Sequence, residues 1–326
     1  TTAGSNSSFG NQTLCINTTG SQNTAIGFRA MCKNTTGNDN VALGINALKL
    51  NTTGSTNVAA GRDALVSNTT AGNNIGVGSY SLKSTTTGSN NIGIGQGALC
   101  TNVTGIKNIA IGTEALRYNT GSNNTAIGYV ALDANTTASN NTAVGESASG
   151  KNTTGAQNTT VGAGSFACNT TGSNNTAIGQ AALESNTTGG SNTAVGRKTF
   201  ENVTTGSANV AIGICAGSDA SMINITTESN RFVAGHNDIT NAYVKVDWTV
   251  TSDLRDKTEI GDVPVGLQFV DKLKPVSFRF KKSRENPEPH GFKKYGFLAQ
   301  DILELEGSDN VIIDNENEEN LKLTNS

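Results

Sequence analysis

The chain is poor in the residues that build an ordinary globular core. Of its 326 residues only 5% are aromatic and 15% are charged, and there is a single tryptophan. Its four prolines all follow residue 260. Chains with so few large apolar groups are usually disordered, unless a repeat lets small residues stack in register. The composition therefore argues against a compact globule.

The same scarcity excludes several classes of partner and cofactor. No apolar run approaches the roughly 18–20 residues that span a bilayer, so we expect no membrane insertion. The net charge of -3 gives no electrostatic attraction for nucleic acid, and we expect none to bind. The five cysteines include no C-x-x-C pair, and only two histidines accompany them. We therefore expect no metal site and no cofactor.

What the chain has instead is a repeat of 17 residues, approximately S-N-N-T-A-I-G-x-x-A-L-x-x-N-T-T-G. The glycine of N-T-A-I-G marks its register, and every interval is 17 residues except one of 16. Such a strict register argues against disorder, and β-branched residues, Asn and Gly are poor helix formers. The marker glycines are Gly10, Gly27, Gly44, Gly61, Gly78, Gly95, Gly112, Gly128, Gly145, Gly162, Gly179, Gly196 and Gly213.

Residues before the marker glycine alternate between branched and small, as in Val41, Ala42 and Leu43. This alternation is the period of a β-strand with two different faces. One unit cannot bury so few apolar atoms, but a stack of units can. We therefore predict a mainly β protein with a β-solenoid (β-roll) shaft of 13 coils, about 4.8 Å apart and about 60 Å long. The small residue is expected on a face pressed against another chain.

Asparagine stands four residues before the marker glycine in every copy. When identical asparagines stack at the spacing of neighbouring strands, each side chain can donate to the next in an amide ladder. We predict a structural ladder that consists of Asn23, Asn40, Asn57, Asn74, Asn91, Asn108, Asn124, Asn141, Asn158, Asn175, Asn192 and Asn209.

Sequons of the type N-x-T recur at one corner of the predicted coil. Composition alone produces such sequons, and in a phage protein they would carry nothing. In a eukaryotic secreted fibre they would hold a ladder of glycans. They include Asn17, Asn34, Asn51, Asn68, Asn135, Asn152, Asn169 and Asn186.

The cysteines have two interpretations. We expect them to be reduced and to serve as small apolar fillers. Cys15 and Cys32, however, occupy the same position in neighbouring repeats. A disulfide between adjacent coils is therefore the alternative.

The character of the chain changes after about residue 218. Residues 1–217 carry 10 Lys/Arg and 7 Asp/Glu, whereas the remaining 109 residues carry 13 and 19. We divide the chain into a solenoid shaft at 1–217, a β transition segment at 218–251 and a small α+β domain at 252–326. The transition segment has strand-like alternation in NRFVAG and AYVKVDWTVT.

In the last domain we expect a short helix from Gly266 to Leu273, closed by Pro275, and then the strand VSFRF. A loop over Glu285–His290 should lead to YGFLAQDILELE, a strand that enters an amphipathic helix.

Two resemblances to known families follow from these motifs. The A-I-G and A-V-G cores of roughly residues 6–217 resemble the heads of trimeric autotransporter adhesins and Asn/Thr-rich repeats of phage fibres. The blocks SDLRDKTEI, GLQFVDKLKPVSFRF and YGFLAQDI, within residues 252–302, resemble the intramolecular chaperone of endosialidase (peptidase S74) domain. That family trimerises fibres and spikes, mainly of phages, so the resemblance implies a homotrimer. Its members usually continue into long helices, so we expect this domain to be truncated after residue 326.

The resemblance also implies self-cleavage after assembly, by a single-turnover serine peptidase. The family's Ser–Lys dyad falls on Ser252 and Lys257, and the scissile bond is then Thr251–Ser252. Asp253 and Arg255 would support the turn. Serine is a poor nucleophile until a base accepts its proton, and a lysine accepts it only when neutral. Spacing alone also allows a solvated, charged turn with no chemistry.

The leading interpretation is a structural and adhesive trimeric fibre of a virion, in a phage tail or capsid. Its partner would be a host-cell surface receptor, either a glycan or a surface protein. One alternative is an extracellular fibril or adhesin of a cell surface, with glycans on the N-T-T corners. Another is a spike that degrades host polysaccharide, although acidic pairs such as Glu304 and Glu306 are more typical of a solvated face.

Overall fold

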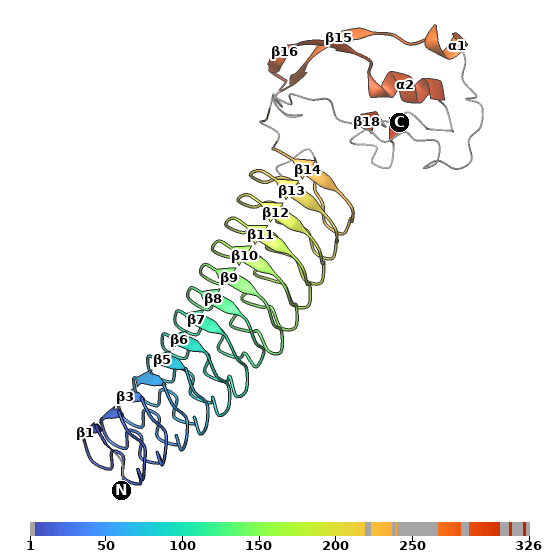
Figure 1. Cartoon of the computed structure of the whole chain (residues 1–326). Coiled ribbons are helices and arrows are strands. Elements are labelled where there is room, and N and C mark those ends of the chain that lie inside the picture. The colour runs from blue at the N-terminus through green and yellow to red at the C-terminus, as the bar shows by residue number, and fades with distance from the viewer. Residues whose placement is uncertain are drawn as a thin grey trace, which may run out of the picture. The chain divides into compact units, whose positions relative to one another are not determined.

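The structure is a computed structural model that describes residues 4–218, 223–236, 239, 267–281, 287–306, 313–314 and 322–323. The chain divides into two compact units, Thr1–His236 and Asn237–Ser326. Figure 1 shows the first unit as a stack of coils and the second as short helices and strands.

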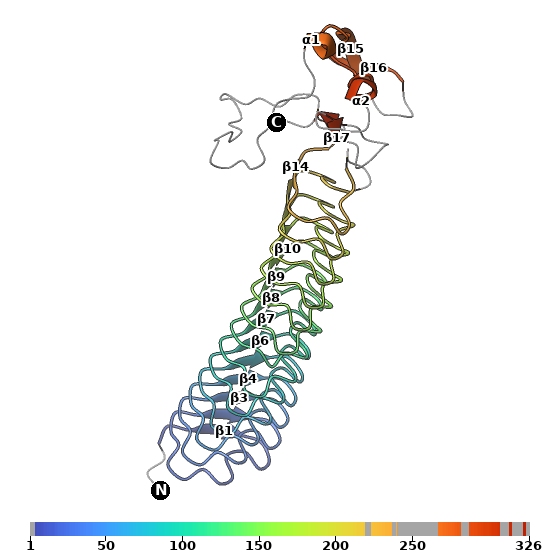
Figure 2. The same cartoon turned by 90° about the vertical axis from the view of Figure 1, so that its right-hand side faces the viewer.

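The first unit is a parallel β-solenoid with one short strand in each coil (Figure 2). Its strands form one 14-stranded sheet in which β1 to β14 lie side by side in sequence order. Each strand pairs with its counterpart one repeat later, so that Ala25 lies opposite Ala42 and Ala42 opposite Ala59. The predicted mainly β solenoid is confirmed. The bounds are β1 Ser7–Phe9, β2 Thr24–Ile26, β3 Val41–Leu43, β4 Val58–Ala60, β5 Ile75–Val77, β6 Ile92–Ile94, β7 Ile109–Ile111, β8 Thr125–Ile127, β9 Thr142–Val144, β10 Thr159–Val161, β11 Thr176–Ile178, β12 Thr193–Val195, β13 Val210–Ile212 and β14 Phe232–Ala234.

The coil that is one residue short keeps its place in the sheet. Ala110 of β7 still pairs with Ala126 of β8. The missing residue belongs to the corner, which reads N-T-G from Asn119 to Gly121. There Nδ2 of Asn124 donates to Oδ1 of Asn119 at 3.1 Å. The corner therefore absorbs the deletion and the strand register is unchanged.

The sheet extends one strand beyond the thirteen repeats. β14 pairs with β13, with Val233 opposite Ala211. The last coil is longer than the others. The backbone N–H of Arg231 donates to Asn209 Oδ1, and these two residues are 22 apart in the sequence, whereas Asn209 and Asn192 in the coil before are 17 apart. The solenoid thus continues past residue 217, into the segment predicted to be a β transition.

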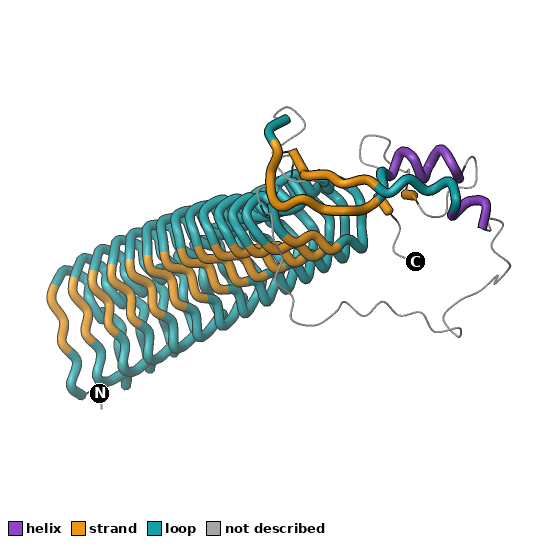
Figure 3. Tube along the Cα trace, turned by 90° about the horizontal axis from the view of Figure 1, so that it is seen from above, coloured by secondary structure: helices purple, strands orange, loops and turns teal. Residues whose placement is uncertain are grey.

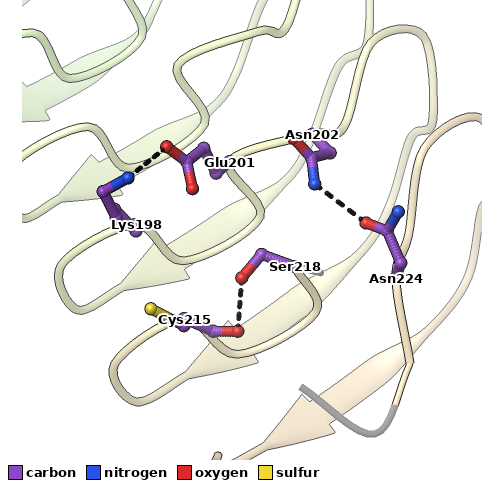
Figure 4. A network of polar contacts seen from close by, with 6 residues as sticks. All are labelled: Lys198, Glu201, Asn202, Cys215, Ser218 and Asn224. Atoms are coloured by element: carbon purple, nitrogen blue, oxygen red, sulfur yellow. Dashed lines mark hydrogen bonds and ion pairs between the residues drawn. The ribbon is translucent and has the colours of Figure 1, made fainter. Parts of the chain in front are cut away.

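One side-chain contact ties this longer coil to the coil before it, and two others lie within single turns (Figure 4). Asn202 Nδ2 donates to Asn224 Oδ1 at 3.1 Å, and Ser218 Oγ donates to the carbonyl oxygen of Cys215 at 2.7 Å. Lys198 pairs with Glu201 at 2.7 Å on the neighbouring turn.

Glu228 caps a turn of the same coil. Its carboxylate accepts hydrogen bonds from the backbone N–H of Thr226 at 2.7 Å and of Thr227 at 3.0 Å. These bonds, above all the one from Thr226, lower the pKa of Glu228 because they favour the ionised form.

The small residue at the centre of each strand points into the coil. Ala42 is fully buried, whereas the neighbouring Leu43 is 39% exposed. The central residue is buried in every strand from β2 to β13, and its two neighbours are half-buried or exposed. The expectation that the small residue faces another chain is therefore wrong. The coil interior already holds asparagine and leucine side chains, which leave room only for a small group.

The interior is filled by the strand alanines, by a second alanine three residues after the marker glycine, and by leucine one residue later. Full burial of a leucine contributes about 1.5–3 kcal/mol relative to an exposed one, so a long stack provides a substantial core. The buried side chains in the leucine column are Met31, Leu48, Leu65, Leu82, Leu99, Leu116, Leu132, Phe166, Leu183 and Phe200.

A polar pair interrupts this core between β9 and β10. Ser149 takes the place of a leucine and Thr160 that of a strand alanine, and both are buried. Their hydroxyl oxygens lie 3.0 Å apart, and Thr160 Oγ1 also donates to the carbonyl oxygen of Thr142 at 3.1 Å. Ser149 therefore donates to Thr160, and both buried hydroxyls have a partner. The apolar residues accordingly form two clusters, one that ends at Ala148 and one that begins at Phe166.

The turn after each strand depends on backbone conformations that L-residues rarely adopt. At Gly61 φ is +142°, and a Cβ there would lie 2.6 Å from the carbonyl group of Gly78 in the next coil. Leu48 and Leu65 each have φ of 50°, in the left-handed region. The N–H of Leu48 donates to the carbonyl oxygen of Ala64 at 3.0 Å, and this ladder bond and the burial of the side chain offset the strain.

The second unit contains a hairpin and short helices. Antiparallel pairing between β15 and β16 places Ser277 opposite Tyr295. The strand VSFRF and the helix in AQDILELE lie where they were predicted. The elements are α1 Leu267–Val270, β15 Val276–Lys281, β16 Pro289–Gly296, α2 Ala299–Glu306, β17 Ile313–Asp314 and β18 Lys322–Leu323.

Two boundaries in this unit differ from the prediction. The helix expected to reach Leu273 ends at Val270, because the N–H groups of Lys272 and Leu273 donate to carbonyl oxygens only three residues back. Pro289 begins β16, so it is part of the hairpin and not of the predicted loop.

Candidate functional site

The asparagines beside the strands form a buried column of hydrogen bonds. The backbone N–H and Nδ2 of Asn40 donate to Asn23 Oδ1 at 3.0 and 3.1 Å, and Nδ2 also donates to Gly54 O at 2.9 Å. These bonds hold successive coils in register. The backbone N–H bond to the preceding Oδ1 recurs at Asn23, Asn40, Asn57, Asn74, Asn91, Asn108, Asn124, Asn141, Asn158, Asn175, Asn192 and Asn209.

The asparagines of the N-T-T corner form a second ladder, which was not predicted. Nδ2 of Asn51 donates to Asn34 Oδ1 at 2.8 Å and to Gly54 O at 2.8 Å. The 17-residue spacing of the corner, with one interval of 16, was the signal that could have revealed it. Its members are Asn17, Asn34, Asn51, Asn68, Asn102, Asn119, Asn135, Asn152 and Asn169, and Asn186 stands in the same column without a side-chain bond to Asn169.

This second ladder contradicts the idea of glycans on the corners. N-glycans are attached to Nδ2, the atom that donates into the ladder. Apart from Asn17, the sequon asparagines predicted to carry glycans are at most 1% exposed. The folded coil therefore has no room for a sugar at these positions.

The second ladder is broken where another residue replaces asparagine. Thr85 follows Asn68 in the column, and Asn68 Oδ1 has no hydrogen-bond partner among the described residues. Val203 follows Asn186, whose Oδ1 and Nδ2 are likewise unpaired within the described part of the chain. An unpaired buried polar group costs about 1–3 kcal/mol, so these two points are weak places in the shaft.

The other repeated feature is the outer face of the sheet, formed by the first and third residues of each strand from β1 to β14. The orange strands in Figure 3 form one continuous side of the coil stack. Along it, Ile94 is 38% exposed, Ile111 37% and Ile178 39%. Every residue of the outer face is uncharged, and the third residue of each strand is Ile, Val, Leu, Phe or Ala. The 10 Lys/Arg and 7 Asp/Glu of residues 1–217 all lie on other parts of the coil.

The described residues of the second unit bury very little apolar surface within one chain. Among its described residues, Ile302 of α2 is the one buried hydrophobic side chain, at 4% exposure. Phe292 and Tyr295 of β16 are 80% and 81% exposed, and Val270 is 58% exposed. A single copy of this unit therefore leaves large apolar groups uncovered.

The predicted catalytic residues lie outside the described part of the structure. They are Thr251, Ser252, Asp253, Arg255 and Lys257. In the described residues no group of three His, Cys, Asp or Glu side chains could hold a metal ion. No described helix combines the length and apolarity that a membrane crossing needs.

Residues 252–311 match the family described as chaperone of endosialidase. The matched stretch includes α1, β15, β16 and α2. Neither a search of curated proteins nor a search of solved structures found a match. A long parallel β-solenoid that precedes a chaperone of endosialidase domain fits a trimeric, fibre-like protein.

Proposed function

We propose that the chain is a structural and adhesive fibre protein that works as a homotrimer. The solenoid is its shaft, and the domain that begins at residue 252 brings three chains together. The fibre belongs to a virion, as a tail or capsid fibre, and its shaft presents or spaces a surface that binds a receptor on the host cell. The observation that carries the proposal is the match of residues 252–311 to the chaperone family, directly after a regular solenoid.

The exposed apolar groups of the second unit support association. Phe292 and Tyr295 lie almost fully in solvent in a single chain. Among the residues that the structure describes in this domain, Ile302 is the one buried hydrophobic side chain, and soluble domains of this size need a larger buried core. Packing between copies would cover these side chains, as expected of a domain that is stable only when assembled.

The two asparagine ladders support the role of the shaft. Each coil contacts only its neighbours, so the stability of the solenoid is a sum of coil and interface contributions. Buried amide ladders repeated along the stack make every interface similar. The result is a stiff spacer whose length is set by the number of repeats.

The proposal includes self-cleavage between Thr251 and Ser252. Lys257, as the neutral amine, accepts the proton of the Ser252 hydroxyl while Oγ attacks the carbonyl carbon of Thr251. The peptide C–N bond breaks, and the amine of Ser252 leaves after protonation. The resulting ester is then hydrolysed by water, which releases a carboxylate on Thr251 and restores the serine hydroxyl. Asp253 and Arg255 orient the turn.

Intact-mass measurement of Ser252→Ala tests the cleavage. The wild type should yield fragments 1–251 and 252–326, and Ser252→Ala only the uncut chain. Lys257→Arg should also stay uncut, because an arginine keeps its proton, whereas Lys274→Arg should be cut like the wild type. Cleavage that persists in Ser252→Ala would contradict the assignment.

Sedimentation equilibrium tests the assembly. The uncut Ser252→Ala protein should have three times the 33.5 kDa mass of one chain. A mass of one chain would contradict the trimeric fibre. Binding of the fluorescently labelled shaft to host cells, compared with cells of an unrelated host, tests the adhesive role.

A further inference from the structure

The outer face is too long and too apolar for a surface that contacts only water. Its third-residue column contains partly exposed Ile, Val or Leu in most strands, such as Ile94, Ile127 and Ile178. The column is continuous, because the strands follow one another at about 4.8 Å and the sheet has no gap from β1 to β14. Contiguous apolar patches larger than a few hundred Å² are rare on monomers and usually mark an interface.

The regularity of the outer face favours a second copy of this chain over a small ligand or a local receptor site. Ligand sites combine a concave surface with a few polar groups at specific points. The outer face instead repeats the same uncharged, β-branched pattern from coil to coil. A surface with the same 17-residue period would match it along its whole length.

Cyclic symmetry gives a reason for the absence of charge. In a parallel trimer, each residue that faces the threefold axis meets its own two copies. A charged residue there would be buried against like charges, which is strongly unfavourable. Charges do occur immediately beside the face, at Arg62 and Glu146 after the marker glycine and at Asp39 and Lys107 before the ladder asparagine. The charge-free zone is therefore limited to the surface that would be covered.

We infer that the outer faces of three chains pack against one another along the shaft, in parallel and in register. This inference rests on the proposed trimer and names the surface that the shafts use. The small central residues, which stay inside each coil, take no part in it. The contact is made by the branched side chains on either side of them.

The test compares two glutamates in the full-length chain. Ile111→Glu places a charge on the outer face, where Ile111 is 37% exposed in a single chain. Thr113→Glu places the same charge two residues later, at an exposed position outside the face. Thermal unfolding of the shaft is followed by circular dichroism, and shape is followed by sedimentation velocity.

Ile111→Glu should lower the melting temperature by several degrees more than Thr113→Glu and raise the frictional ratio, because the shafts separate. Its melting temperature should recover as the pH falls below about 4.3, where glutamates become protonated and the like charges disappear. A wild type that sediments as one chain would overturn the proposed trimer. A trimeric wild type in which both variants behave alike would overturn the packing of the outer faces and leave the trimer standing.

A second, independent feature lies on another side of the first two coils. Cys15 and Cys32 occupy the same column, with their Sγ atoms 2.6 Å apart. Cys15 is exposed and Cys32 half-buried. Cys100, by contrast, has Lys83 and Arg117 as its column neighbours. The structure describes all five cysteines. Cys15 and Cys32 are the one pair among them that faces each other in adjacent coils.

We propose that Cys15 and Cys32 form a disulfide that links the first coil to the second. The oxidant is a small disulfide such as oxidised glutathione. The thiolate of Cys15 attacks it, forms a mixed disulfide and releases one glutathione thiolate. The thiolate of Cys32 then attacks Cys15 Sγ and releases the second, so that two thiols lose two protons and two electrons to the oxidant. Burial, and then the hydrogen bond with Cys15, raise the pKa of Cys32, which leaves the exposed Cys15 as the first nucleophile.

The measurement is alkylation followed by peptide mass analysis, after incubation with oxidised glutathione. Peptides with Cys15 and Cys32 should be found joined and resistant to alkylation, while Cys100 stays alkylatable. Cys32→Ser should instead trap a glutathione adduct on Cys15. If the wild type retains two alkylatable thiols, or carries glutathione on both cysteines, the bridge does not form.

Discussion

The break in the corner ladder leads to a prediction that a single substitution can repair it. Asn51 Nδ2 donates to Asn34 Oδ1 at 2.8 Å, and Asn68 Nδ2 donates to Asn51 Oδ1 at 2.7 Å. At the next position Thr85 is fully buried, and its hydroxyl donates to the carbonyl oxygen of Asn102 at 2.9 Å. Asn68 Oδ1 is left with no partner among the described residues. Thr85→Asn should supply the missing donor.

The expected gain follows from counting the groups affected. Nδ2 of the new asparagine can donate to Asn68 Oδ1 and to Gly88 O, as its counterparts do in other coils. Satisfying the buried acceptor is worth about 1–3 kcal/mol, and the lost bond from Thr85 to Asn102 about 1 kcal/mol. Ordering the longer side chain costs up to about 1 kcal/mol. Because the new bond to Gly88 O offsets the lost one, the net gain lies between zero and about 3 kcal/mol, and its middle of about 1–2 kcal/mol corresponds to about 2–8 °C in melting temperature.

The reverse substitution is the matched control. Asn51→Thr creates the same break at an intact rung and leaves both Asn34 Oδ1 and Asn68 Nδ2 without their ladder partners. It should destabilise the shaft by about 1–3 kcal/mol. Both variants are measured by thermal and urea unfolding, with circular dichroism as the signal. If Thr85→Asn lowers stability, or if the two substitutions change it in the same direction, the amide ladder does not control the cohesion of the coils.

Other features of the solenoid lead to further predictions. Gly61→Ala should destabilise by about 2–5 kcal/mol, because its Cβ would lie 2.6 Å from the backbone of the next coil. Gly97→Ala, where φ is +68° and the nearest atom is 3.7 Å away, should cost only about 1–2 kcal/mol by urea unfolding, and equal losses at both sites would contradict the steric argument. Thr160→Ala should leave the buried Ser149 hydroxyl without a partner, whereas Ser149→Leu leaves Thr160 its bond to the carbonyl oxygen of Thr142. The double variant should be more stable than the sum of the single effects by about 1 kcal/mol; additive effects would show that the hydroxyl pair is not coupled. Because its pKa is lowered, Glu228 should contribute stability at neutral pH that is lost as the pH falls through that pKa; an NMR titration that gives an ordinary glutamate pKa would refute the cap.

The stacking of the shaft could be predicted from its repeat. The order of the strands and their parallel register follow from the 17-residue spacing of N-T-A-I-G, because identical units stack with identical residues opposite one another. The ladder column beside the strands follows in the same way. In the C-terminal domain the blocks VSFRF and AQDILELE predicted β15 and α2 by their alternation and amphipathic spacing.

Only the closed coil determines which side chains of each strand point into the interior. Alternation of branched and small residues shows that a strand has two different faces, but not which of them is inside. Asn40 and Leu48 of one turn occupy the interior, so Ala42 fits there and Leu43 must lie outside. Closure of the coil also buries the corner asparagines, although their N-x-T motifs alone would indicate glycosylation sites.

Backbone strain and the end of the shaft were also beyond local inference. Leucine has no preference for positive φ, yet Leu48 adopts 50°, because its N–H and carbonyl must reach neighbouring coils while its side chain stays buried. Beyond residue 217 the repeat motif is lost, but β14 still joins the sheet through a 22-residue coil. Short-range patterns set the period of this chain, and the three-dimensional closure of each turn set which atoms are inside.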